Sequence, residues 1–291
     1  MFTIAGVTGH VGGVAADRLL AKGQALRVIV RDAAKAEAWK KRGAEAVIGN
    51  LADAAFLERA LTGAQGAFLL LPPDFPTGEI YTHQKRVSEA IGKAVLASKV
   101  PHVVLLSSIG AQHPSGTGPI QGLFHAENHL RAANVRRTFV RAAFFMENLG
   151  AFLGAARGQG VYPNFLPPGV ASPMVATRDI GELVAEALLA PPQPPISERI
   201  YDLGGPADYT PEDVADLMGA AVGKSVKVSH VPPAAAEGAL VQAGVPAFMA
   251  VAYAEMYAAM ASGLAAFGQG EQRRGKLALA EVLKAFASAS Q

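Results

Sequence analysis

The sequence predicts an α/β fold in which helices cover both faces of a doubly wound parallel sheet. Short apolar or β-branched runs alternate with amphipathic stretches through about the first hundred residues, as expected for strands joined by crossover helices. A glycine-rich turn directly follows the first apolar run. Apolar residues make up 51% of the 291-residue chain and charged residues only 17%, so the chain can bury a large core.

The elements expected in this first part are short strands and the helices that connect them. Each expected strand is a run of apolar and β-branched residues, and each expected helix has apolar residues at helical spacing. The expected strands are 2–7, 25–30, 45–48, 66–71 and 102–106, and the expected helices are 11–22, 33–42, 53–61 and 81–98.

The composition of the sequence changes near residue 150, where glycine and proline become more frequent. We therefore expect a nucleotide-binding core over residues 1–150 and a smaller C-terminal α/β lobe over 151–291 that binds the substrate. A segment at about 175–205 is expected to return to the core. The later elements expected are helices at 124–133, 178–189, 210–222 (N-cap Thr210, with Pro211 in the first turn) and 245–268, strands at 138–141 and 199–203, and a stiff proline-rich connector at 191–195.

Composition excludes several classes of function. The net charge of +2 is small and scattered, so we expect no nucleic-acid groove. The absence of cysteine excludes disulfides, zinc–thiolate sites and cysteine nucleophiles. The most membrane-like stretch, 245–268, is mostly alanine and contains Glu255, which favours a half-buried helix over a membrane span. The N-terminus lacks a signal-peptide pattern, and we expect a cytoplasmic protein.

The strongest motif is the run from Gly6 to Gly12, which has the spacing G-x-x-G-x-x-G between an expected strand and an expected helix. Small residues are needed there because the turn is tight, the backbone must approach a pyrophosphate, and the helix must pack on the strand. The pyrophosphate would meet unpaired N–H groups at the positive end of the helix dipole. The residues predicted to contact this part of a dinucleotide are Gly6, Thr8, Gly9, His10, Val11 and Gly12.

The tip of the second strand indicates which dinucleotide is bound. An acidic residue at that point would bind a ribose diol and favour NADH. Here Arg31 occupies the tip, with Lys35 about one helical turn further on. Two cations suit a 2′-phosphate, so we predict a preference for NADP(H), with NAD(H) as the alternative. The competing interpretation is a solvated arginine paired with Asp32 or Glu37.

Several segments together resemble one family. The run from Gly6 to Gly12 is similar to the start of the NmrA-like atypical short-chain dehydrogenase/reductases, and Arg-x-x-x-Phe-Met-Glu-Asn from Arg141 to Asn148 is the most specific further match. The other similar segments are 49–53, 102–111, 175–180 and 201–206. The resemblance implies a Rossmann core with a smaller C-terminal lobe and a substrate cleft between them. It implies that the protein is an NAD(P)H-dependent reductase of quinones, dyes or other small molecules. The alternative that it implies is a non-catalytic redox sensor that binds NADP and a protein partner.

The resemblance also implies further contacts with the cofactor. Asn50 would lie near the adenine, and the segment after the fourth strand would pass along the cofactor. The end of the fifth strand would lie near the nicotinamide, and the segment from Ala142 to Phe145 would close over its ring. The residues concerned are Leu70, Leu71, Pro72, Ser107, Ser108, Ile109, Ala142, Ala143 and Phe144.

The usual acid catalyst of short-chain dehydrogenases is missing. They use a Tyr-x-x-x-Lys pair, and no such pair follows Ser108; Leu123 stands where relatives often have lysine. A quinone or conjugated dye needs no strong general acid, so a reductase of such an acceptor is the first interpretation. A non-catalytic NADP(H)-binding sensor is the second. A reductase that uses His125 or His129 is the third, with Ser108 as another candidate.

The two histidines are four residues apart, but no third ligand accompanies them, so we predict no metal site.

The substrate is expected to meet residues that follow the sixth strand and one face of the 245–268 helix. Phe145, Met146 and Asn148 follow a strand that ends at the cofactor side. Tyr253 and Met256 belong to an apolar stripe that could form a flat wall for an aromatic ring. The complete stripe is Met249, Tyr253, Met256, Met260 and Leu264. The same stripe could instead be core or a dimer seam, so the protein is expected to be a monomer or a homodimer.

Overall fold

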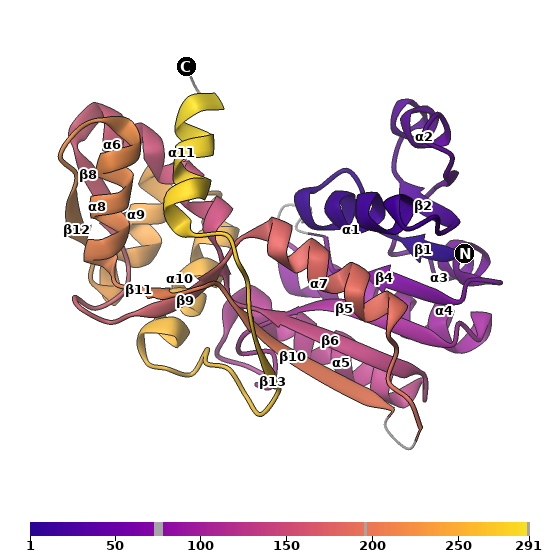
Figure 1. Cartoon of the computed structure of the whole chain (residues 1–291). Coiled ribbons are helices and arrows are strands. Elements are labelled where there is room, and N and C mark those ends of the chain that lie inside the picture. Colours follow the sequence, from indigo (N-terminus) through magenta and orange to yellow (C-terminus); the bar gives the residue numbers. More distant parts are fainter. Residues whose placement is uncertain (73–77, 195–196, 290–291) are drawn as a thin grey trace.

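The structure is a computed structural model that describes residues 1–72, 78–194 and 197–289. It contains a large parallel sheet with helices on both faces and, beside it, a smaller group of helices and short strands (Figure 1). The last proline of the expected connector at 191–195 lies outside the described residues.

The large sheet has eight strands in the order β13-β10-β6-β5-β4-β1-β2-β3, and all its neighbouring pairs are parallel. Its strands are β1 (Phe2–Ile4), β2 (Leu26–Val30), β3 (Glu45–Ile48), β4 (Gly66–Leu69), β5 (His102–Ser108), β6 (Arg136–Ala142), β10 (Glu198–Gly204) and β13 (Glu271–Arg274). β1 lies between β2 and β4, so the direction of winding reverses there. Dinucleotides bind at such a switch point, outside the carboxyl ends of the strands. The predicted doubly wound α/β fold is therefore confirmed.

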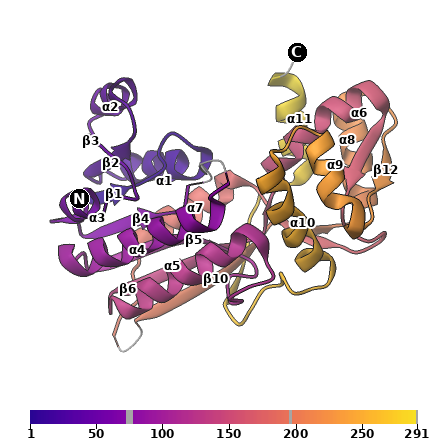
Figure 2. The same ribbon diagram turned by 180° about the vertical axis from the view of Figure 1, so that it is seen from behind.

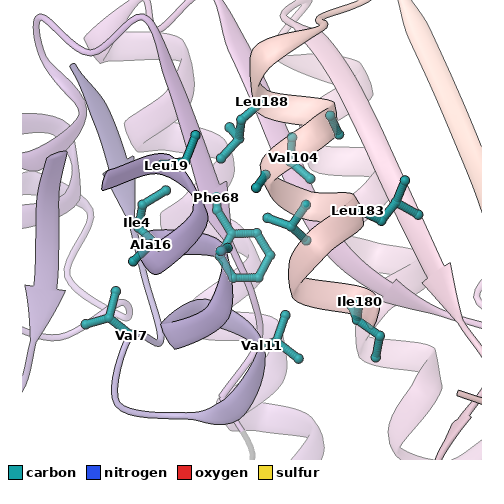
Figure 3. Packing of buried hydrophobic residues seen from close by; sticks show 14 of the residues in the cluster. Ile4, Val7, Val11, Ala16, Leu19, Phe68, Val104, Ile180, Leu183 and Leu188 are labelled. Atoms are coloured by element: carbon teal, nitrogen blue, oxygen red, sulfur yellow. The ribbon is translucent and has the colours of Figure 1, made fainter. Parts of the chain in front are cut away.

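Two sets of helices cover the sheet (Figures 1 and 2). One face is covered by α1 (His10–Ala21) and α7 (Thr177–Leu189), with α2 (Ala33–Lys40) beside β2 and β3; the other is covered by α3 (Ala54–Leu61), α4 (Ile80–Ser98) and α5 (Gln121–Ala132). Figure 3 shows the ring of Phe68 lying between α1 and α7, where Leu19 and Leu188 are also buried. This face forms one continuous apolar core.

The smaller part of the chain is built from segments that leave the sheet and return to it. The chain leaves after β6, returns for α7 and β10, leaves again, and returns for β13. Its short sheets have the orders β11-β9-β7 and β12-β8. The elements are β7 (Phe144–Phe145), η2 (Met146–Phe152), α6 (Leu153–Gln159), β8 (Val161–Asn164), β9 (Ser172–Val175), β11 (Asp208–Tyr209), α8 (Pro211–Val222), β12 (Lys227–His230), η3 (Pro233–Ala235), α9 (Ala236–Gln242), α10 (Ala247–Ala261) and α11 (Leu279–Ala289).

The predicted bounds of the helix at 245–268 are wrong, because the helix in the structure is shorter. α10 begins directly after Pro246, which is its N-cap, and ends at Ala261. Ser262 caps it, and Gly263 has a φ of +77°, a left-handed conformation that ends the helical path. The residues after it run as an irregular segment to β13, which the sequence analysis did not anticipate.

Two carboxylates, Glu127 and Glu147, accept hydrogen bonds on either side of the place where the chain first leaves the sheet, after β6. Glu127 is fully buried and pairs with Arg141 through two hydrogen bonds, Nε to Oε1 at 3.0 Å and Nη2 to Oε2 at 2.7 Å. Ser107 Oγ donates to Oε1 of Glu127 at 2.6 Å. Beyond β6, Glu147 accepts from the backbone N and from Oγ1 of Thr177, the first residue of α7. The segment through which the chain leaves the sheet (the exit segment, residues 141–147) is therefore held by hydrogen bonds at both of its ends.

The Glu127–Arg141 pair gives a stability prediction. Glu127→Gln should destabilise the protein by about 3–5 kcal/mol, because the amide cannot replace a carboxylate and leaves the guanidinium buried without its counter-charge. Urea unfolding measures this. The control is Glu37→Gln, which removes the exposed pair with Lys40 and should cost under about 1 kcal/mol. Equal losses for the two variants would show that the buried pair is not a structural anchor.

Candidate cofactor and acceptor site

The glycine-rich turn joins β1 to α1 with almost no free space. Gly6 has a φ of +66°, and its carbonyl accepts from the N–H of Gly9 at 3.0 Å. A Cβ at Gly12 would lie 2.5 Å from the Gly6 oxygen and 2.7 Å from that of Ala5. Both neighbours are backbone atoms and cannot rotate away. Glycine at position 12 therefore lets α1 pack directly on the end of β1.

The N-terminus of α1 is open to solvent. Its N-cap, Gly9, provides no side-chain cap, and the first turn contains no acidic residue. Thr8, Gly9 and His10 are exposed. The positive end of the helix dipole and its uncapped amides thus face outward beside the glycines of the turn. These features fit a pyrophosphate.

The charged residues named in the NADP(H) prediction directly follow β2. β2 ends at Val30, and Arg31 and Lys35 are both exposed. Asp32 is the N-cap of α2, and its carboxylate accepts from the backbone N–H of Lys35 at 2.8 Å. Its carboxylate thus has a local role in starting α2. At the end of β3, Asn50 Oδ1 accepts from the N–H of Ala52 at 2.9 Å, which shapes the loop expected near the adenine.

The remaining predicted cofactor residues line the carboxyl edge of the sheet. Leu70 lies over Gly6, whose missing Cβ would be 2.6 Å from Leu70 Cδ2. The N–H of Ile109 donates to the carbonyl of Ala142 at 2.9 Å, which holds the ends of β5 and β6 together. Ser107 is turned toward Glu127 by its hydrogen bond. The other members are Leu71, Pro72, Ser108 and Phe144, which are half-buried, and Ala143, which is buried.

The two histidines proposed as acids lie one turn apart on α5 but differ in exposure. His125 is exposed. His129 packs against Gly92 of α4, where a Cβ on the glycine would be 2.8 Å from that of His129. Its Nδ1 is buried without a hydrogen-bond partner, and burial is the main cause that lowers the pKa of the ring. The contacts of His129 are those of a packing residue between α4 and α5.

The residues predicted to contact the acceptor do not form one surface. Met146 is fully buried in the core of the smaller part. Phe145 packs against the core that contains α1 and α7, whereas Asn148 is exposed. Tyr253 packs in a separate cluster with α9. Only Met256, whose backbone N lies near Gly118, is close to the segment that begins α5.

A small cavity next to Phe144 is lined by aromatic residues that the sequence analysis did not identify. Its free volume of about 20 Å³ has room for little more than a water molecule, so a ring could enter only if side chains moved. Phe165 and Tyr257 stack there with ring centroids 4.5 Å apart. The full lining is Phe144, Phe152, Tyr162, Pro163, Asn164, Phe165, Leu166, Met174, Tyr257 and Met260.

A larger groove of about 770 Å³ runs along α7 between α1 and the 273–281 segment. It is lined largely by charged side chains and includes none of the predicted cofactor or acceptor residues. We therefore place the site at the carboxyl edge of the sheet, where the topology and the glycine turn coincide.

The described residues contain no cluster of His, Cys, Asp and Glu suited to a metal ion. In the same part of the chain, no helix has the length and apolar character needed to span a bilayer.

Comparison with known proteins identifies the family. The NmrA-like family matches residues 1–276. The chain belongs to this family. It therefore has the NAD(P)-binding fold of the atypical short-chain dehydrogenase/reductases.

Among its relatives is the NAD(P)H azoreductase of Xenophilus azovorans, 29% identical over 261 residues that cover 89% of this chain and 86% of the relative. The triphenylmethane reductase of Citrobacter sp., solved with NADP(H), has a TM-score of 0.82 at 22% identity and covers 98% of this chain and 100% of that chain. The NADPH-dependent quinone oxidoreductase of Escherichia coli, solved with NADPH, has a TM-score of 0.77 at 22% identity, covering 99% and 95%. The azoreductase and the quinone oxidoreductase are thus named as NAD(P)H- or NADPH-dependent enzymes, and the triphenylmethane reductase was solved with NADP(H).

The packing of α1 on β1 predicts that Gly12→Ala disrupts the turn. Its Cβ would collide with backbone oxygens, so α1 must shift, at a cost of about 1–3 kcal/mol in stability, with a loss of at least about tenfold in NADPH affinity. Urea unfolding and a fluorescence titration with NADPH measure the two effects. Gly154→Ala in α6 is the matched control, because a Cβ there meets nothing within 4 Å. Wild-type NADPH binding by Gly12→Ala would contradict the assignment.

The exposed cations after β2 predict cofactor selectivity. Arg31→Ala should weaken NADPH binding by about 1–3 kcal/mol while leaving NADH nearly unchanged, because only NADPH carries the 2′-phosphate. Dissociation constants for both cofactors provide the measurement. Lys41→Ala, which removes an exposed cation at the other end of α2, should affect neither. Equal losses for NADPH and NADH would refute a 2′-phosphate contact at Arg31.

Proposed function

We propose that this protein is an NADPH-dependent reductase of a quinone-like or otherwise conjugated small molecule. One observation carries the proposal: the tight glycine turn before α1 lies at the same edge of the sheet as the end of β5, and no Tyr-x-x-x-Lys pair follows Ser108. Relatives named as an azoreductase, a quinone oxidoreductase and a triphenylmethane reductase support this class of acceptor.

The residues that would hold the cofactor follow the edge of the sheet from β3 to β6. The turn from Gly6 to Gly12 would take the pyrophosphate, and Arg31 with Lys35 the 2′-phosphate. Asn50 would lie near the adenine. Along the remaining edge, the proposed contacts are Leu70, Leu71, Pro72, Ser107, Ser108, Ile109, Ala142, Ala143 and Phe144. Bound there, NADPH would supply a hydride from its nicotinamide ring.

The chain itself would contribute orientation and exclusion of water. Ile109, Ala142 and Ala143 are buried and apolar, so they would give the nicotinamide an apolar floor. Leu123 is half-buried on α5 and offers no proton donor. The half-buried Ser108 offers a hydroxyl for one hydrogen bond to the acceptor. A conjugated acceptor delocalises the transferred charge and can take its proton from water, so this set of residues suffices.

The test is NADPH oxidation in the presence of quinones, azo dyes, conjugated enones and simple ketones. We expect turnover above NADPH and buffer controls with at least one conjugated class and none with simple ketones, because only the latter need a strong general acid. Repeating the active assay with Arg31→Ala should reduce the rate at low NADPH and restore it at saturation. Tight NADPH binding without turnover across the panel would replace this proposal with a non-catalytic NADP(H) sensor.

A further inference from the structure

α10 packs against the part of the molecule that contains the large sheet, and the residues at this contact are small. It packs against η1 (Gly118–Ile120), the turn that leads into α5 (Figure 2). A Cβ on Gly118 would lie only 2.1 Å from the Ala252 carbonyl oxygen. Ala252 and Ala259 are 1% and 2% exposed. The face of α10 that meets the core therefore contains alanines rather than the Met and Tyr side chains of the predicted stripe.

A carboxylate lies on this alanine face. Glu255 is spaced three residues after Ala252 and four before Ala259, which places it on the same side of the helix. It is half-buried, and its Oε2 accepts a hydrogen bond from Tyr81 Oη at 3.1 Å. Burial, followed by the charge of Glu255, raises the pKa of Tyr81 to about 12. The phenol therefore stays protonated and donates to the carboxylate at physiological pH.

Glu255 has no ion-pair partner among the residues that the structure describes. The contrast with Glu127 is direct, because that carboxylate receives hydrogen bonds from Ser107, Arg131 and Arg141. Its hydrogen bond to Tyr81 lies at the exposed surface, so water screens the carboxylate and no cation within the protein is needed. The charge therefore remains available to a ligand with a positive charge.

The position of Glu255 connects it with the acceptor end of the site. Tyr81 is the second residue of α4, which begins beyond the carboxyl end of β4, and η1 precedes α5 beyond the carboxyl end of β5. Both helices therefore start at the edge of the sheet where ligands bind. Arg31 and Lys35 lie after β2, across β1 and β4 from there. At the opposite end Glu255 lies beside the start of α4, where Glu79, Lys85 and Arg86 are also exposed.

We propose that Glu255, held in place by Tyr81, selects the acceptor by its charge. Conjugated acceptors with a positive charge are favoured, neutral acceptors are accepted, and sulfonated or carboxylated acceptors are disfavoured. The location of the acceptor rests on the proposed function, but the charge selection is a separate claim. If the Tyr81–Glu255 bond only ties α10 to α4, neutralising Glu255 will change stability without changing the preference between charges.

The test uses three naphthoquinones that differ only in one substituent: a trimethylammonium group, a methyl group or a sulfonate. The kcat/KM of the wild type should be at least about fivefold higher for the cationic than for the sulfonated quinone, with the neutral one between them. Glu255→Gln keeps an oxygen that can accept from Tyr81 but removes the charge, and should reduce this ratio to near one. The wild-type ratio should also shrink as salt is raised.

A binding measurement accompanies the kinetics. Naphthalenes with the same three substituents, which cannot be reduced, are titrated into protein loaded with NADP⁺, and the same order of affinities is expected. Glu58→Gln is the matched control, because it removes an equal charge from an exposed position on α3. It should leave the preference at the wild-type value.

The outcomes separate the two proposals. Turnover with the same charge ratio in wild type and Glu255→Gln overturns the charge selection and leaves the reductase intact. A Glu255-dependent preference in binding without reduction of any quinone overturns the reductase and leaves the charge selection standing. If none of the naphthalenes binds, the charge selection is wrong as well.

Discussion

The constraint on which the glycine turn depends is the close packing of α1 on its neighbours, which is made through two glycines. Gly12 allows α1 to lie against the end of β1, and Gly181 allows α7 to lie against α1, where a Cβ would be 2.7 Å from the Val11 oxygen and from Val14 Cβ. α1 is thus held between the first strand and a helix that comes much later in the chain. Because α7 is also capped by Glu147 at Thr177, the helix that would bind pyrophosphate is connected mechanically to the exit segment after β6.

This connection explains the most specific family segment, from Arg141 to Asn148. Arg141 pairs with the buried Glu127, Met146 fills the core of the smaller part, and Glu147 caps α7. Each of these side chains fixes the path of the chain between the two parts of the molecule. The motif therefore specifies a junction, and Phe144 and Phe145, which form β7, lie within it.

The parts of the fold with local signals could be predicted from the sequence. β3 lies at residues 45–48 as predicted, and α8 begins after Thr210, whose side chain forms a capping box with Asp213. β13 was missed because its sequence, Glu-Gln-Arg-Arg, has no apolar pattern; pairing with β10 makes it a strand. On α10, apolar residues occur on every side, so periodicity could not identify the face that meets the core. The pairing of Glu127 with Arg141 also depends on tertiary structure, because it joins a helix to a neighbouring strand.

The same residue type has two different roles on α5 and α10, and the difference lies in the partners. Glu127 is fully buried, and every acceptor position that faces a donor is used, so its charge is neutralised within the protein and contributes to rigidity. Glu255 receives one neutral hydrogen bond from Tyr81, which orients the carboxylate but leaves its charge in place. In the proposed charge selection, this oriented carboxylate would act on a ligand that approaches the acceptor edge. Glu127 thus fixes the backbone from within the protein, whereas Glu255 would act on the ligand.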